Sequence, residues 1–302
     1  MAFRPKNANQ TSSSSKQFDT PSNFPTPKAG SRPARVSLIV DLGVQEREDF
    51  DDGKGNTRPQ KPCQQVAVFA DLVRDVVDYG GNIGKAHYRL LLNKQFAGKL
   101  QGINFVATPP KDVNGNLIPN KPWALHPASL LTKLAKATGN DDVITDMDIS
   151  KLLNGTFTAD VKITEKESEK KDDNGNPIVY KFVNFAGAAK VPPVFDDETG
   201  EEKPAVLPAL QTEALCIGFD DAQPEHIKYL RGSIIQTIKL ATNYAGSQMQ
   251  KAIEAFEADP EAYGGFAKPE PKEAPAAKAP KAENKPKKTS TAVEDEDSDL
   301  PY

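Results

Sequence analysis

The sequence predicts a mainly β domain with helices, flanked by two disordered tails. Through the middle of the 302-residue chain, short runs of alternating apolar and polar residues lie between clusters of Gly, Pro and Asn, which is typical of strands joined by turns. Towards the end of this region, apolar residues recur at the spacing of an amphipathic helix. Only 37% of the chain is hydrophobic, which is low for a chain that packs over its whole length.

Composition divides the chain into four segments. Residues 1–35 are rich in Ser, Thr, Asn and Pro and carry six bases against one acid, so we expect a flexible basic arm. Residues 36–266 contain nearly all the apolar periodicity and form the expected folded domain. Residues 267–290 repeat Ala, Lys, Pro and Glu, which predicts an extended linker. Residues 291–302 form an acidic tip with five acids and no base.

Four runs of alternating residues open the folded domain and predict strands. They are residues 36–40, 65–69, 87–92 and 103–107. A polar loop over 109–122 follows, and Asn114-Gly115 predicts a tight turn within it.

Two short helices are expected next. Residues 127–138 have one apolar face, and Gly139 stands where a helix-ending glycine is typical. Asp148 is a suitable N-cap for the second helix, which we expect to end before Gly155.

A β-hairpin should complete the strands. Residues 157–164 alternate, residues 173–176 predict a turn, and residues 178–183 return as the pairing strand. Pro192-Pro193 should end the ladder, because proline has no N–H to donate. About five to seven strands interrupted by a helical segment suit a small closed barrel of OB type, with a β-sandwich as the alternative.

One apolar stripe predicts a helix of about eight turns at the end of the domain. Pro224 suits its first turn, whereas Gly232 and Gly246 could divide it into two helices. The stripe would pack on the barrel or against a second subunit, which leaves a homo-oligomer possible. Its members are Ile227, Leu230, Ile234, Ile238, Ala241, Ala245, Met249, Ile253 and Phe256.

Several functional classes are not expected. Cys63 and Cys216 form no CxxC pair and no cluster with histidine, so we expect two reduced thiols and neither a metal nor another cofactor. No apolar run is long enough to span a membrane, and no signal-peptide core is visible, which predicts a cytoplasmic protein that contacts no membrane. A metal-dependent nuclease would need carboxylates, but the acidic pairs at 141–142, 146–148 and 172–173 lie beside turns or helix starts, where Asp caps N–H groups. We therefore expect no enzyme.

Aromatic and basic residues occur together on the predicted strands. Single-stranded nucleic acid is bound by cations along its phosphates and by flat rings against its bases. Trp123, in a proline-flanked loop, would either stack on a base or cap the core. The formal net charge is −4, so a DNA-binding groove would have to be a local basic patch. The candidate DNA-binding residues are Lys85, Tyr88, Arg89, Lys94, Phe96, Trp123, Lys162, Tyr180, Lys181 and Phe182.

The last six residues, DSDLPY, resemble the acidic tip of bacterial single-stranded-DNA-binding proteins, which ends in aspartates, an aliphatic residue, proline and an aromatic ring. Tyr302 stands where phenylalanine is more usual, and Ser298 interrupts the acidic run. The resemblance implies that the tip binds partner proteins. The matching positions are Asp297, Asp299, Leu300, Pro301 and Tyr302.

Residues 148–193 are similar to bacteriophage single-stranded-DNA-binding proteins. The likeness is a short helix closing as Leu-Leu-Asn-Gly, a strand, a charged hairpin, and an aromatic strand closing as Val-Pro-Pro. It implies an OB-fold protein that binds and protects single-stranded DNA during phage replication and recombination in a bacterial cytoplasm. Polymerase and primase-helicase are the implied partners of the tip. The alternative is a non-enzymatic structural or adaptor protein whose barrel binds protein.

Overall fold

The computed structural model describes residues 26–264, except for 52, 79–84, 97–98, 110, 112–113, 115, 120, 172–174 and 197. The described residues all belong to one compact unit. Their fold is mainly β with helices, as predicted. Most of the predicted basic arm and the whole of the predicted linker and acidic tip lie outside the described residues.

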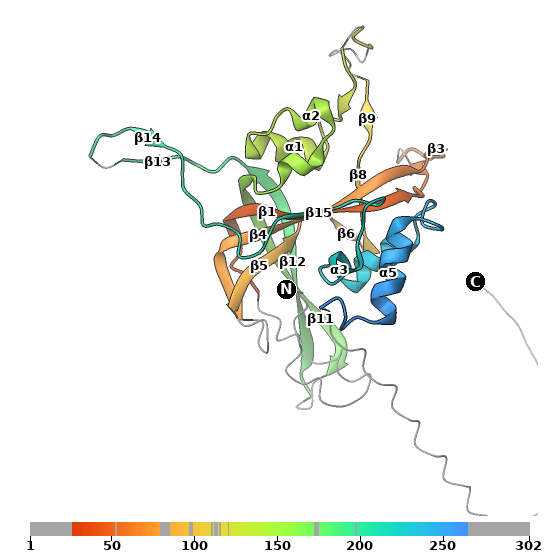
Figure 1. The fold of residues 1–302 in the computed structure, drawn as a ribbon. Helices are drawn as coiled ribbons and strands as arrows, with labels where there is room; N and C mark the ends of the chain where they lie inside the picture. The colour runs from red at the N-terminus through yellow and green to blue at the C-terminus, as the bar shows by residue number, and fades with distance from the viewer. Residues whose placement is uncertain are drawn as a thin grey trace, which may run out of the picture. The chain divides into compact units, whose positions relative to one another are not determined.

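Five long strands form the main sheet of the described chain, which is antiparallel along the order β12-β11-β1-β4-β5 (Figure 1). The alternating runs at 36–40, 65–69, 157–164 and 178–183 all lie within these strands, and 87–92 overruns its strand by one residue. The strands are β1 (Gly30–Gln45), β4 (Cys63–Asp78), β5 (Lys85–Leu91), β11 (Thr156–Lys171) and β12 (Pro177–Ala189).

β1 begins earlier than the sequence indicates. Its first residues, Gly30 to Arg35, pair with β11, although we assigned them to the flexible arm. Two arginines in this stretch have partners: Arg32 forms a 2.5 Å ion pair with Asp75, and Arg35 donates to the carbonyl of Pro208 at 2.7 Å. Such partners let a polar stretch without apolar alternation become a strand.

The prediction of a closed barrel is wrong. The sheet curls until its two edge strands, β5 and β12, approach each other, but no hydrogen-bonded pairing joins them among the described residues. Residues of both edge strands line a pocket between the two edges. The long strands form one curled sheet, so the β-sandwich alternative is not observed.

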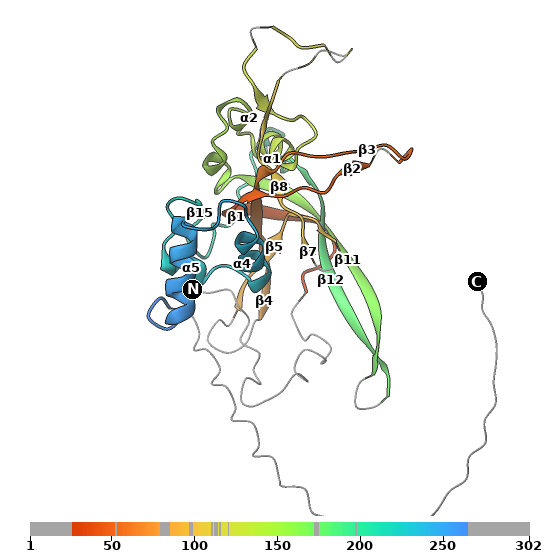
Figure 2. The same ribbon diagram turned by 90° about the vertical axis from the view of Figure 1, so that its right-hand side faces the viewer.

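Shorter strands surround the sheet. β15 (Leu215–Ile217) pairs in parallel with β1, and β8 (Ile103–Asn104) pairs with β4. The single strand predicted over 103–107 is wrong, because β9 begins only at Ala107 and pairs elsewhere. Two hairpins, β2–β3 and β13–β14, project from the sheet (Figures 1 and 2). The remaining bounds are β2 (Phe50–Asp51), β3 (Thr57–Arg58), β6 (Gln95–Phe96), β7 (Lys99–Leu100), β9 (Ala107–Thr108), β10 (Ala124–Leu125), β13 (Val194–Phe195) and β14 (Glu202–Lys203).

The predicted turns are only partly described. Gly115 and residues 172–174 lie outside the described residues, so neither turn can be compared in full. β12 ends at Ala189, just before Pro192-Pro193, as expected for residues that cannot extend a ladder.

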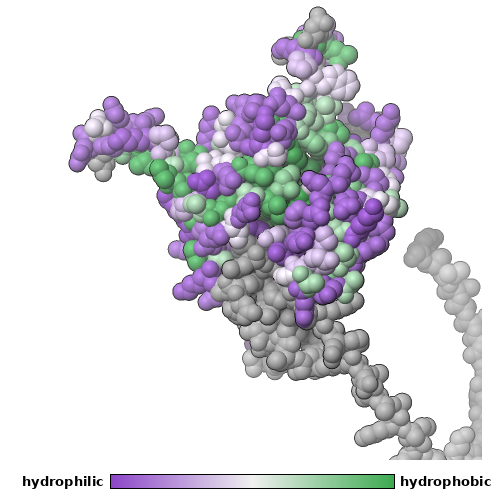
Figure 3. All heavy atoms as spheres, viewed as in Figure 1, coloured by the Kyte–Doolittle hydropathy of each residue, from purple (hydrophilic) through white to green (hydrophobic). Residues whose placement is uncertain are grey.

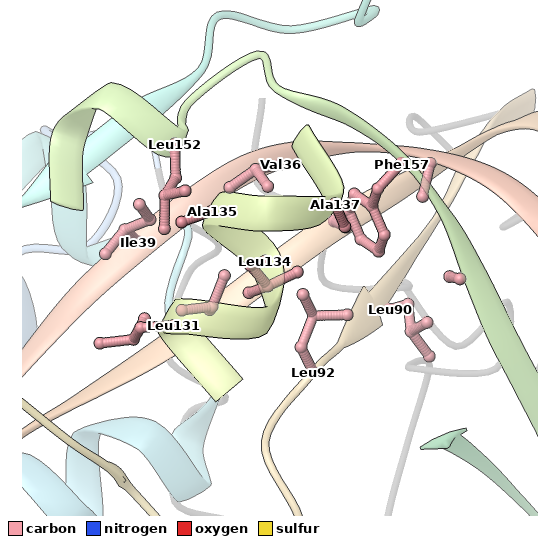
Figure 4. Packing of buried hydrophobic residues seen from close by; sticks show 14 of the residues in the cluster. Val36, Ile39, Leu90, Leu92, Leu131, Leu134, Ala135, Ala137, Leu152 and Phe157 are labelled. Carbon is pink, nitrogen blue, oxygen red and sulfur yellow. The ribbon is translucent and has the colours of Figure 1, made fainter. Parts of the chain in front are cut away.

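α1 (Leu130–Thr138) covers one face of the sheet and closes the first hydrophobic core (Figure 4). Leu131 and Leu134 are fully buried in a cluster that includes Leu90 and Phe157. The helix begins three residues later than predicted, because the Ser129 hydroxyl caps it by accepting from the N–H of Leu131.

The ends of these helices follow the predicted capping. Gly139 adopts a left-handed conformation with φ 78° at the end of α1, which favours glycine. α2 (Val143–Asp146) follows. Asp148 then caps the second predicted helix, which is the 3₁₀ helix η2 (Ile149–Leu152), and its carboxylate accepts from the N–H of Ser150.

Three helices cover the other face of the sheet and form the second core. They are α3 (Pro224–Ile227), α4 (Gly232–Lys239) and α5 (Gln248–Ala258). The single long helix we predicted is therefore wrong, and so is the division into two. Of its apolar stripe only Ala245 is exposed, so the stripe does pack on the sheet, through three short helices. None of the described helices is long and apolar enough to cross a membrane.

Gly43 holds this helical layer close to β1. Its φ is 78°, and a Cβ there would lie only 2.6 Å from the Phe219 ring and 2.7 Å from Ala241. The adjacent N–H of Val44 donates to the side chain of Asn243 at 2.8 Å. Because Gly43 has no side chain, the bulge at this position lets the connection between α4 and α5 pack directly on β1.

Candidate nucleic-acid interface

One face of the β11–β12 hairpin combines rings and cations. The register places Thr164 opposite Phe182 and Lys166 opposite Tyr180, and alternate residues of a strand share a face. Lys162 therefore lies on this face as well. The Phe182 side chain is 46% exposed, so its ring is open to solvent. Lys166 was not among the predicted residues, although the alternation that starts at Lys162 indicates it.

Lys181 lies on the opposite face of the same hairpin. Its ammonium nitrogen is 3.2 Å from a carboxylate oxygen of Glu165, the residue opposite it in the ladder. Both side chains are about half exposed, at 50% and 56%. Surface pairs of this kind contribute little to stability, so another anion can replace Glu165 as the partner of Lys181.

A pocket of about 190 Å³ lies in the seam between β5 and β12. It brings together Tyr88, Lys181 and Phe182, three of the predicted DNA-binding residues, which come from two distant parts of the sequence. Its other lining residues are Leu90, Leu91, Asn93, Gln95, Val183, Asn184 and Arg231.

Tyr88 presents a neutral phenol to this pocket. Burial raises the pKa of its hydroxyl, and the nearby Arg231 guanidinium opposes that rise by a smaller amount. The ring is half-buried on β5, the edge strand. Tyr88 can therefore offer both an aromatic surface and an O–H donor at neutral pH.

Arg231 reaches the pocket from the helical layer. It lies just before α4, where it donates to the backbone carbonyl of Arg89 at 3.2 Å and lies 5.7 Å from the centre of the Phe69 ring. Sequence reasoning missed this residue, because nothing in the local pattern links it to strands more than a hundred residues earlier.

Two asparagines shape the pocket. The buried Asn93 amide accepts from the N–H of Val68 at 2.9 Å and donates to the carbonyls of Val66 and Gln101, so it continues the ladder where β5 ends. Asn184, on β12, donates to the Thr164 hydroxyl at 3.1 Å and to a backbone carbonyl of the same strand at 3.3 Å.

Arg89 lies outside the candidate interface. Its side chain is 6% exposed and its Nε donates to Asp71 at 2.9 Å. The same Asp71 oxygen accepts from the Ser37 hydroxyl at 2.7 Å, while the Arg89 guanidinium also donates to Thr212 at 3.2 Å. This buried network belongs to the interior beneath the helical layer, and we do not include Arg89 among the residues proposed to bind DNA.

The other predicted residues lie around the pocket or away from it. Lys94 is exposed beside the pocket-lining Asn93, and Lys85 is exposed at the start of β5. Trp123 is 61% exposed, which excludes the core-capping alternative, but it does not line the pocket. Phe96 lies on the short β6, and its side chain is not described. The tip residues 297–302 lie outside the described residues.

Acidic pairs and thiols are the other groups in the sequence that could carry chemistry. No group of three or more His, Cys, Asp or Glu side chains that could hold a metal ion occurs there. Asp142 and Asp146 both pair with Lys151, at 3.1 and 2.5 Å. Both cysteines are free thiols, and burial raises the pKa of each, that of Cys216 to about 11.

Comparison of the chain with models of protein families, with curated proteins and with solved structures finds no match. The functional interpretation therefore depends on the geometry of the seam and on the sequence patterns.

Proposed function

We propose that this protein binds single-stranded DNA along the seam between β5 and β12 and on the adjoining face of the β11–β12 hairpin. The observation that carries the proposal is that Tyr88, Lys181 and Phe182 line one pocket. They were selected from separate sequence segments for the chemistry of stacking and phosphate contact. A groove with rings for bases and cations for phosphates is the arrangement that single strands require.

The strand order also favours an OB-type interpretation. The five long strands, with α1 between the third and fourth, follow the arrangement of an OB barrel opened between its third and fifth strands. OB barrels are often partly open and bind oligonucleotides on one side of the barrel. We further propose that the protein acts in phage DNA replication and recombination in a bacterial cytoplasm, recruiting polymerase or primase-helicase through its tip.

Stacking on the hairpin gives the main test of this proposal. Tyr180→Ala and Phe182→Ala should each weaken binding of a labelled oligothymidine by about 1–3 kcal/mol, measured by fluorescence anisotropy, because each removes a ring for stacking. Phe195→Ala is the matched control, since Phe195 is 60% exposed on β13 and does not line the pocket. Equal affinity in all three folded variants would refute the stacking assignment.

The dependence of affinity on salt concentration and the comparison of single strand with duplex complete that test. Log K should fall linearly with log salt concentration, because phosphate contacts release counterions. Duplex of the same sequence should bind more weakly, since its bases are not open to the pocket. Equal binding of duplex and single strand would contradict the proposed site.

Glu165→Gln should strengthen single-strand binding by about 1.5- to 5-fold at low salt, the range expected for an exposed ion pair. The change removes the carboxylate that occupies Lys181 and leaves the lysine free for phosphate. Glu257→Gln is the control, because Glu257 pairs with Lys239 in the helical layer at 2.8 Å. A gain that is equal for both variants would show only the change in net charge.

A protein-binding role is the second candidate. Val194, Phe195 and Val206 are 56%, 60% and 89% exposed on and beside the β13–β14 hairpin. Figure 3 shows hydrophobic residues gathered towards the base of this hairpin. An adaptor protein that uses this surface would show no salt-dependent binding to oligothymidine, which the anisotropy measurement detects directly.

A further inference from the structure

We propose that the seam pocket takes one unstacked nucleobase from the bound strand, and that Arg231 binds the phosphate next to it. This inference rests on the proposed function, which it makes more specific. It turns a general stacking surface into a site with one defined base position and adds a phosphate contact from the helical layer.

The size of the pocket fits one base. Its volume of about 190 Å³ is below the range of roughly 300–1,000 Å³ typical of sites that enclose whole small molecules. A planar base ring fits this space, whereas the sugar and phosphate would remain outside.

The walls suit a flat aromatic guest. Tyr88 and Phe182 contribute rings to the lining, and most of the remaining exposed lining is polar. A ring inserted here would leave water and gain contact with other rings, as bases do in single-strand-binding grooves.

Asn184 gives the pocket a polar contact for the base edge. Its amide N–H groups donate to Thr164 and to the carbonyl of Phe182, which fixes its orientation. Among the described residues, no donor is seen to bond its Oδ1, so this oxygen can accept from an N–H of the base. The Asn93 amide has its own backbone partners and shapes the pocket without reading the base.

Arg231 is placed to hold the adjoining phosphate. The Phe69 ring and the carbonyl of Arg89 fix the guanidinium, and no carboxylate in the described part of the chain forms an ion pair with it. A guanidinium has five donors in a planar fork and can bind a phosphate with two of them. Lys181, on the β12 side of the same pocket, provides a second cation.

Two single-stranded oligomers, one with bases and one without, separate the base contact from the phosphate contact. We would measure, by fluorescence anisotropy over a range of salt concentrations, the affinity for oligothymidine and for a sugar-phosphate oligomer of equal length without bases. Asn184→Trp should fill the pocket from an exposed strand position while keeping both cations. It should weaken oligothymidine binding by between about 5-fold and 150-fold, the value of one stacked base, and leave binding of the abasic oligomer unchanged.

Arg231→Gln should weaken the binding of both oligomers and reduce the salt slope by about one, because it removes one phosphate contact. Arg74→Gln, which changes an exposed arginine of β4 outside the pocket, should do neither. Thermal unfolding of each variant checks that the fold is retained.

The possible failures are distinct. If the unmodified protein binds no single strand, the proposed function is wrong. If it binds oligothymidine and the abasic oligomer equally well, or if Asn184→Trp weakens neither, the strand binds without a base in the pocket. If Arg231→Gln matches Arg74→Gln, the phosphate contact is wrong.

Discussion

Replacing Asp71 with alanine is expected to lower the free energy of unfolding by about 3–5 kcal/mol, the usual cost of removing one partner of a buried ion pair. Asp71 is completely buried, and its carboxylate accepts from both Arg89 and Ser37. Without it, the Arg89 guanidinium would lose this ion pair in the interior. Urea unfolding followed by circular dichroism would measure the change.

The matched control for Asp71 is Asp142→Ala, which breaks an exposed pair with Lys151. That change should cost much less than the loss of Asp71, because solvent screens the pair. A similar small loss for Asp71→Ala would show that the Arg89 side chain can leave the interior. The backbone of Arg89 also accepts from Arg231, so the same substitution should loosen one wall of the seam pocket.

Removing residues 291–302 is expected to strengthen single-strand binding at low salt, and the gain should shrink as salt rises. The deleted segment carries five carboxylates and no base, so it competes with DNA for the same cations. A linker of about 30 residues spans roughly 30 Å if flexible and more if proline-rich. Tethering would give the tip an effective concentration on the order of millimolar. Weaker DNA binding after truncation would contradict this competition.

Tyr302→Ala should abolish capture of polymerase or primase-helicase in a pull-down while leaving DNA affinity nearly unchanged. The substitution removes the aromatic anchor that would enter an apolar pocket on the partner, but it keeps every carboxylate. Truncation and Tyr302→Ala would therefore separate the two proposed roles of the tip. Retention of the same partners by the Tyr302→Ala variant would refute the anchor.

The long strands could be predicted because burial on one face leaves a pattern in the sequence. Phe157, Ala159 and Val161 alternate with polar residues and are buried as expected. The first residues of β1 escaped prediction because Arg32 and Arg35 depend on partners far along the chain, and no local pattern encodes such partners. Periodicity likewise located the apolar stripe of the last helices but not the breaks between them.

The candidate site could be predicted only in part, for the same reason. Composition selected Tyr88, Lys181 and Phe182, which the structure brings to one pocket, but it also selected Arg89, whose side chain is buried. Whether a cation on a strand faces solvent depends on what packs above it. A helical layer from later in the chain packs above Arg89. Arg231 and Asn184 became candidates only when their neighbours were known.

The position of β1 at the centre of the sheet has a consequence for how the protein folds. One edge of β1 pairs with β11 and then with β15, so Gly30 meets Val161 and Leu38 meets Leu215. Pairings between residues so distant in sequence raise the contact order and slow folding. At a synthesis rate of about 5–20 residues per second, β1 is made many seconds before β15, its pairing strand, has been synthesised. Refolding should be slow, and the seam, which joins residues 88, 182 and 231, should acquire its shape only in the last step.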